Sequence, residues 1–267
     1  MQKETHKAMK TLIRLWILFF LTTAIHPMQA QRRSPDYRIT PGNDAILQLE
    51  ECREWIHTAW ATLEKTDNGL FTYIHPEAAP FIDLRTFHLE DSTKPLSPRS
   101  AFANLTDGES FFRVAFPCKP EYTDTYPHSY VAMVYLKKSN GMPFCLKLGN
   151  SQEHLPLTFQ EKPIVRDSTR IPLQIDVPKG NPTLTKEERE LLLTTARRFV
   201  EEQNPEAFHQ LMNVFPIITL HQLHSKDGDT SSFYRVRLFC QGSIHVDVSI
   251  RSDNKQATYL RFESAMP

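Results

Sequence analysis

An internal repeat constrains this chain more than any other feature of its sequence. The segment from Glu50 to Ile74 aligns without gaps on the segment from Glu187 to Leu211. The identical pairs are Glu50/Glu187, Glu51/Glu188, Thr58/Thr195, Ala59/Ala196, Glu64/Glu201 and Phe71/Phe208. A sequence that repeats itself at a fixed offset is typical of duplicated supersecondary units. The chain is therefore predicted to contain two copies of one helix-then-strand unit.

Length and charge limit the classes of protein to consider. The chain has 267 residues, 40% of them hydrophobic, and a formal net charge of zero. This length suits one large domain or two small ones with a buried core. Nucleic-acid binding needs a concentrated basic surface, and the sequence has no long run of either charge. We expect no nucleic-acid partner.

The N-terminus has the pattern of a secretory signal peptide over residues 1–30. Its basic residues are Lys3, Lys7, Lys10 and Arg14, and the apolar run Leu15–Leu21 follows them. This run is shorter than the roughly 20 residues that a membrane-spanning helix needs. We expect cleavage near Ala30 and a secreted or periplasmic protein. The alternative is an uncleaved anchor that tethers the protein to a membrane.

Composition and periodicity divide the rest of the chain. Residues 31–42 form a polar linker, and residues 178–183 (PKGNPT) form a second one. The first unit covers 43–177, with an insertion at about 85–128, and the second covers 184–267. Each unit begins with an amphipathic helix, because apolar residues recur every three or four positions. Thr185 and Glu188 form a capping box at the start of the second helix.

Strand patterns follow each helix. Residues 233–240 and 244–250 alternate between apolar and polar side chains, which is typical of strands with one buried face. Residues 130–136 are apolar at every position, so this strand should be covered on both faces. We expect the second unit or a partner chain to cover its outer face.

The order of the predicted elements, a helix followed by strands in each unit, predicts an α+β fold. The fold would be made of two tandem helix-plus-antiparallel-sheet units. The arrangement resembles the nuclear-transport-factor-2-like (NTF2-like) and cystatin-like folds. The resemblance is architectural and includes no diagnostic motif. Those folds carry dehydratases, isomerases, inhibitors and oligomerisation modules, so they select no function.

Four cysteines would lie in an oxidising compartment if the chain is exported. Cys118 belongs to the insertion and Cys145 to the neighbouring hairpin. A disulfide between them would attach the insertion to the sheet. Cys52 and Cys240 fall on core positions and are expected to behave as small buried hydrophobes.

Two groups of polar residues are candidate sites. Arg235, Arg237, His245 and Asp247 share one face of a predicted hairpin. They form either an anion-binding patch with a titratable histidine or a solvated face with paired charges. In the first unit, the weak catalytic candidates are His75, Asp83 and His88; an acid/base pair needs two such groups within hydrogen-bond reach. The alternative for these three residues is a surface or capping role.

No catalytic motif or metal site emerges from the sequence. His221 and His224 are three apart in a predicted strand, so they point to opposite faces and cannot share an ion. We expect no cofactor. The first hypothesis is a binding protein for a protein partner or a cell-envelope component, with an oligomer possible. The alternative is an exported hydrolase, isomerase or dehydratase with a helix–sheet pocket in the first unit.

Overall fold

The computed structural model describes residues 36–42, 46–66, 69–122, 130–149, 154–166, 171–172, 174–241 and 244–264. Residues from Tyr37 onward form one compact unit. The predicted signal peptide lies outside the described residues, so cleavage and export stay predictions. No helix in these ranges combines the length and apolarity needed to cross a membrane.

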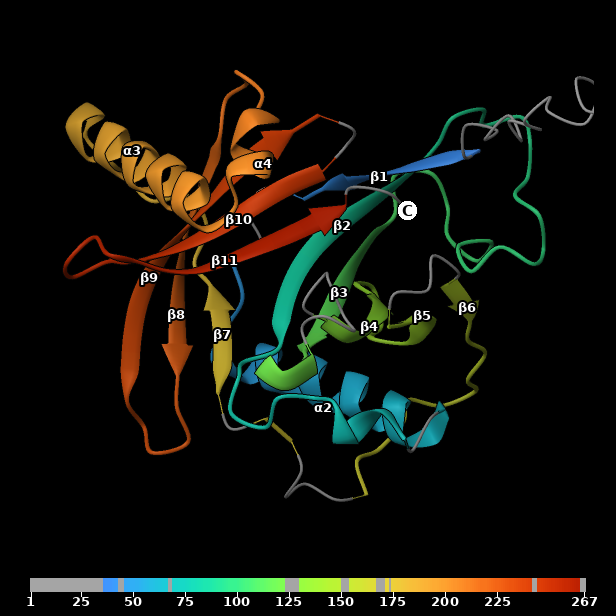
Figure 1. The fold of residues 1–267 in the computed structure, drawn as a ribbon. Coiled ribbons are helices and arrows are strands. Elements are labelled where there is room, and N and C mark those ends of the chain that lie inside the picture. Colours follow the sequence, from blue (N-terminus) through green and yellow to red (C-terminus); the bar gives the residue numbers. More distant parts are fainter. Residues whose placement is uncertain are drawn as a thin grey trace, which may run out of the picture. The chain divides into compact units, whose positions relative to one another are not determined.

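The first sheet is an antiparallel meander of six strands (Figure 1). The strands are β1 (Tyr37–Pro41), β2 (Phe81–Leu89), β3 (Ser110–Pro117), β4 (Tyr130–Lys137), β5 (Pro143–Leu148) and β6 (His154–Pro156). Helix α2 (Leu49–Thr66) packs against β3, β4 and β5. Its buried stripe includes Cys52, Ile56 and Leu63, as the periodicity predicts.

The second sheet has five strands in the order β11-β10-β9-β8-β7. They are β7 (Ile175–Pro178), β8 (Ile217–His224), β9 (Thr230–Cys240), β10 (Ile244–Arg251) and β11 (Ala257–Ser264). Helix α3 (Lys186–Gln203) packs against β9, β10 and β11, and the short helix α4 (Pro205–His209) follows it. The capping box between Thr185 and Glu188 is confirmed at the start of α3.

The expected α+β class, with two NTF2-like or cystatin-like units, is wrong. Across the described ranges the fold is β-rich, with eleven strands in two sheets and three α-helices. Strand β1 occupies the expected linker, while β3 and the second half of β2 occupy the expected insertion at 85–128. Strand β3 gave no alternating signal because residues 111–116 are buried on both of its faces. The internal repeat therefore predicts the helices better than it predicts the sheets.

The doubly apolar strand β4 is covered on both faces, as expected. The expectation that the second unit or a partner chain covers its outer face is wrong for Tyr135, which packs against Phe102 of the first unit's own β2–β3 connection. One face packs under α2, and the other lies in a second core cluster with Ala101, Phe102 and Leu105 from the β2–β3 connection. Phe102 is fully buried, and its ring lies 5.7 Å from the Tyr135 ring and 5.9 Å from the Phe144 ring between centroids. The connection between β2 and β3 is thus part of the core.

The predicted disulfide between Cys118 and Cys145 is wrong. All four cysteines are buried thiols. Cys118 packs in the cluster under α2, whereas Cys145 packs in the cluster on the other face of the sheet. Since the two side chains are on opposite faces, they cannot bond without moving the backbone. Burial raises the pKa of Cys145 well above its ordinary value, which keeps that thiol protonated and unreactive.

Replacing Phe102 with alanine should reveal how much the β2–β3 connection contributes to stability. Phe102→Ala leaves a cavity among the rings of Tyr135, Phe144 and Phe111. The free energy of unfolding in urea should fall by about 3–5 kcal/mol. Phe215→Ala is the control, because Phe215 is 93% exposed and its loss should change stability by less than about 0.5 kcal/mol. Equal effects of the two variants would contradict a core role for Phe102.

Candidate functional site

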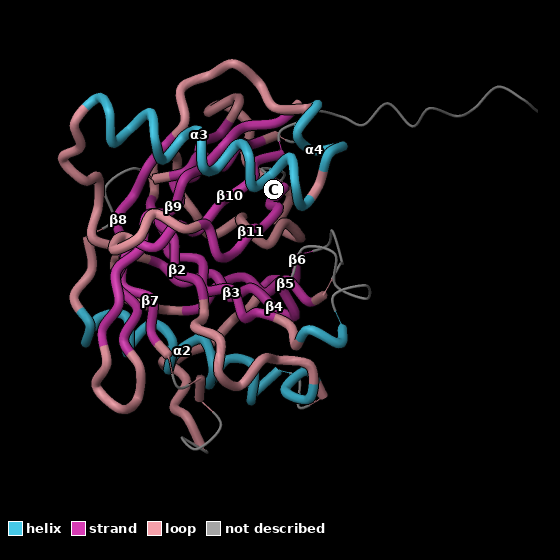
Figure 2. The backbone as a smooth tube through the Cα atoms, turned by 60° about the vertical axis from the view of Figure 1, so that its left-hand side comes forward, coloured by secondary structure: helices cyan, strands magenta, loops and turns pink. Residues whose placement is uncertain are grey.

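The faces of the two sheets that carry no helix look toward each other. Figure 2 shows α2 and α3 on opposite sides of the pair of sheets. In β9 and β10 the side chains alternate: Val236, Leu238 and Val246 pack in the core with α3, and the residues between them point to the first sheet. The face of the second sheet that carries no helix is charged, yet its charged side chains are buried. Its buried polar residues are Asp176, His221, Arg235, Arg237, His245, Asp247 and Arg261.

Strand register brings Asp247 between two arginines. Arg237 lies directly opposite Asp247 on β9, and Arg261 lies directly opposite on β11. Arg237 donates from Nε and Nη2 to the two carboxylate oxygens, both at 2.8 Å, and Arg261 donates from Nη2 at 2.7 Å. Burial by itself would raise the pKa of Asp247, but the two guanidinium groups hold that pKa far below its ordinary value.

A second cluster joins β7, β8 and β9. Asp176 accepts a hydrogen bond from His221 Nδ1 at 2.8 Å and another from Arg235 Nη2 at 2.5 Å. His221 Nε2 faces Arg235 Nη1 at 3.2 Å and the hydroxyl of Thr219 at 2.9 Å. Because arginine can only donate, Nε2 accepts and Nδ1 carries the proton. Burial and the Arg235 charge lower the pKa of His221, so the ring is neutral near pH 7.

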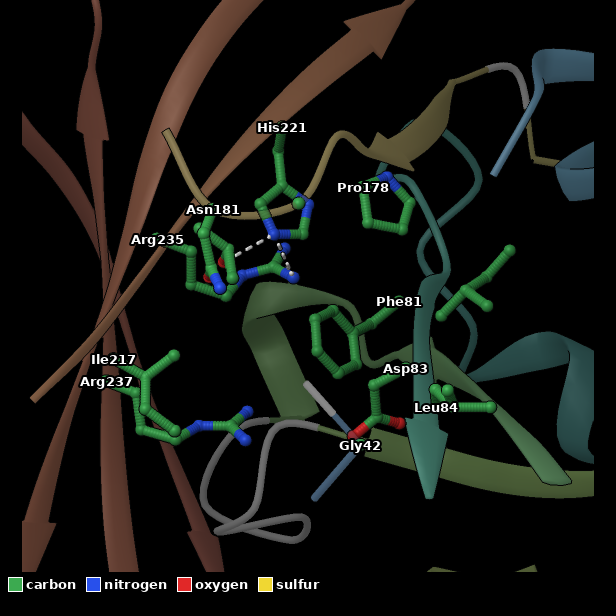
Figure 3. A pocket seen from close by; sticks show the side chains of 13 residues that line it. Gly42, Phe81, Asp83, Leu84, Pro178, Asn181, Ile217, His221, Arg235 and Arg237 are labelled. Carbon is green, nitrogen blue, oxygen red and sulfur yellow. Dashed lines mark hydrogen bonds between the residues drawn. The ribbon is translucent and has the colours of Figure 1, made fainter. Parts of the chain in front are cut away.

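Phe81 links these charges to the first sheet. Its ring centroid lies 3.5 Å from Arg261 Cζ, 4.1 Å from Arg235 Cζ and 5.9 Å from Arg113 Cζ. Figure 3 shows Phe81, from β2, facing Arg235 and His221 of the second sheet. We call Phe81 and these three arginines the Phe81 cluster. Guanidinium groups are attracted to the face of an aromatic ring, so one phenyl group holds cations from both sheets.

The first sheet adds its own ion pairs beside Phe81. Arg113 donates from Nε and Nη2 to the two oxygens of Asp83, both at 2.9 Å. Arg85 approaches the same carboxylate at 2.5 Å. The carboxylate of Asp83 is therefore shared by two arginines, as Asp247 is in the second sheet.

Two cavities border this region. A small one of about 70 Å³ is lined by residues that include Asp83, Thr219, His221 and Arg237 (Figure 3). A larger one of about 970 Å³, which we call the inter-sheet cleft, is lined from both sheets. Phe81, Arg235, Asp247 and Arg261 lie along it, so the Phe81 cluster opens into the cleft.

The hairpin candidates Arg235, Arg237, His245 and Asp247 share one face, as predicted. The interpretation of that face as solvated is wrong, because none of the four is more than 9% exposed. Their charges are paired, but inside the protein, where the first sheet covers them. Arg235 and Asp247 line the inter-sheet cleft, and Arg237 lines the small cavity. His245 is 1% exposed and lies beside Phe239.

The first-unit candidates His75, Asp83 and His88 each have different partners. His75 Nδ1 accepts hydrogen bonds from the backbone N–H groups of Glu77 and Ala78, each at 3.1 Å, which is a local turn role. Asp83 is held by arginines, and His88 Nε2 lies 3.2 Å from the hydroxyl of Thr40. The side chains are not assembled into an acid/base pair. Of the three, His75 lines the inter-sheet cleft.

Sequence reasoning missed Asp176, Arg261 and Phe81. Arg261 stands between Leu260 and Phe262 in an alternating strand, so its place on the charged face could have been recognised. The place of Asp176 could not be recognised from the sequence, because its partner His221 is 45 residues away. Within the described ranges, no group of His, Cys, Asp and Glu is arranged to hold a metal ion.

Comparison with known proteins adds no assignment. No family model, curated protein or solved structure matches this chain.

The buried carboxylates should make the free energy of unfolding depend on pH in the acidic range. Since the pKa of Asp247 is lowered in the folded state, its contribution is complete above the unfolded pKa of about 3.9 and is lost as pH falls. The free energy of unfolding should therefore drop between about pH 5 and pH 2. Asp247→Asn should lower the free energy of unfolding by about 3–5 kcal/mol at pH 7. It should also make that free energy depend less on pH between about pH 5 and pH 2.

Asp227→Asn is the matched control, because Asp227 is exposed in the β8–β9 turn. Its urea unfolding curves should follow those of the wild type at every pH. If the stability of the Asp247→Asn protein depended on acidic pH as the wild type does, Asp247 would have no depressed pKa.

Proposed function

We propose that the protein is a binding protein that holds an anionic ligand in the inter-sheet cleft. The observation that carries this proposal is the cleft itself, a cavity of about 970 Å³ lined from both sheets with Arg235 and Arg261 along it.

Arginine side chains along the cleft suit an anionic ligand. Arginine recognises carboxylate and phosphate groups with paired N–H donors. Arg235 and Arg261 both line the cleft, so they are the proposed contacts for the anion.

The volume of the cleft also supports binding. Ligand pockets usually have volumes of about 300–1,000 Å³, and the cleft of about 970 Å³ lies at the upper end of this range. It is lined by side chains from two sheets, whose packed strands hold them in place. Sites built on such elements are more rigid than sites built on loops.

The geometry favours binding over catalysis. Asp176, His221 and Thr219 form a hydrogen-bonded series like that of a serine hydrolase. Here, however, Arg235 also faces His221 Nε2, at 3.2 Å. A cation at the atom that must accept the proton lowers its basicity, and the adjacent cavity of about 70 Å³ leaves little room for a substrate. We therefore assign these residues to positioning Arg235.

Calorimetric titration of the purified full chain with citrate and with inorganic phosphate tests this proposal. At least one of the two should bind, and its affinity should fall as salt rises. Arg261→Gln should weaken binding more than tenfold. Arg251→Gln, at the exposed rim of the cleft, should weaken it about threefold and cannot disturb the core.

Arg198→Gln on the outer side of α3 is the control, and its affinity should equal that of the wild type. Circular dichroism confirms that each variant is folded. Failure of folded wild-type protein to bind either anion would overturn the proposal, as would unchanged affinity in both cleft variants.

A further inference from the structure

We infer that protonation of His221 releases Arg235 toward the ligand, so that the inter-sheet cleft binds its anion more tightly in mild acid. The inference rests on the proposed function and names how the binding site is regulated. It comes from the hydrogen bonds that hold the guanidinium group of Arg235 beside the cleft.

Two hydrogen bonds of unequal strength hold Arg235. Nη2 donates to the carboxylate of Asp176 at 2.5 Å, and Nη1 donates to Nε2 of His221 at 3.2 Å. Opposite charges strengthen the first bond, whereas the second has a neutral acceptor and is longer. The bond to His221 is therefore the weaker of the two, and it depends on the charge of the ring.

The ring of His221 accepts that bond only while it is neutral. Its Nδ1 carries a proton and donates to Asp176 at 2.8 Å. Its Nε2 then has a lone pair, which faces Nη1 of Arg235 (Figure 3) and the hydroxyl group of Thr219, 2.9 Å away. Both of these groups can act as donors. The neutral ring thus has a partner for each of its nitrogens.

A proton on Nε2 would turn that atom from an acceptor into a donor. It could then donate to Thr219, whose hydroxyl group accepts as well as donates, but not to Arg235, which can only donate. Two positive charges at 3.2 Å would also repel each other. Nη1 would therefore leave Nε2, while Nη2 would keep its bond to Asp176. The cluster has one complete set of hydrogen bonds for each charge state of His221.

Arg235 can move without leaving the surface of the cleft, because its side chain already lines it. Its Cζ lies 4.1 Å from the ring centroid of Phe81 and 5.6 Å from that of Phe233. Aromatic rings attract a guanidinium group over their faces, so these two rings can hold it in either position. A released Nη1 would donate to an anion in the cleft, and the protonated ring would add a positive charge nearby. Both changes strengthen anion binding.

Charged groups from four strands surround His221. They are Asp83 on β2, Asp176 on β7, Arg235 and Arg237 on β9, and Asp247 on β10. Burial and then Arg235 lower the pKa of His221, and the two carboxylates Asp176 and Asp247 act in the opposite direction without cancelling the shift. Because the folded-state pKa lies below the ordinary value of about 6.5, the ring takes up its proton below that pH.

Sulfate titrations of the full chain at about pH 7.5 and about pH 5.5 test the inference. Sulfate is the probe because it stays fully ionised over this range, whereas citrate and phosphate gain protons. Calorimetry should give an affinity about fivefold or more higher at the lower pH. In parallel, NMR spectra of the wild type should show the ring of His221 gaining its proton between about pH 6.5 and about pH 4.5.

His221→Gln separates regulation from binding. Glutamine can accept from Arg235 and donate to Asp176, but it does not titrate. Its sulfate affinity should match the wild type at about pH 7.5 and should not rise at the lower pH. His75→Gln is the matched control, because His75 is a second histidine that lines the cleft, and this variant should keep the wild-type rise. Circular dichroism confirms that each variant is folded.

The outcomes separate the two proposals. If citrate or phosphate binds at about pH 7.5 but sulfate binds equally at both pH values or not at all, the regulation is overturned and the proposed function stands. A rise in affinity that persists in His221→Gln would overturn the role of His221. So would an NMR titration of the wild type in which the ring stays neutral down to about pH 4.5, and this measurement requires no variant. If none of the three anions binds at either pH, both proposals are overturned.

Discussion

The contact of Phe81 with guanidinium groups from both sheets is the interaction on which the rest of the structure depends. Two sheets usually pack through interdigitating apolar side chains. Here the helices already occupy one face of each sheet, and the second sheet presents charged residues on the other. A phenyl ring provides a surface on which arginine side chains can lie flat while their N–H groups still bind aspartates. Burial of the charges is thus possible without a conventional apolar interface.

This arrangement has a thermodynamic consequence. Replacing buried ion pairs by well-packed apolar residues is often neutral or stabilising, whereas removing one partner is strongly destabilising. Buried charge is therefore weak evidence for a role in stability alone. In our proposal, Arg235 and Arg261 are kept at the cleft because a ligand there uses their N–H groups.

Much of the local structure could be predicted from the sequence. The Thr185 and Glu188 capping box, the apolar stripe of α2 and the alternation in β9 and β10 are local patterns, and local patterns are what a single sequence shows. Strand β3 was missed because burial on both faces removes alternation. The site was only half predicted, since Arg235 and Asp247 share a visible hairpin whereas Asp176 and Phe81 meet them through long-range packing. Whether charged residues face water or another sheet depends on that packing.

Strand β7 shows how closely the two sheets depend on each other. It pairs with β8 of the second sheet, yet Val177 is buried in the core under α2 of the first. Its neighbour Asp176 points instead to His221 and Arg235. Four residues therefore contribute to one hydrophobic core, to the edge of the other sheet and to the charged cluster between them. A substitution in this strand would therefore perturb both sheets and both cores at once.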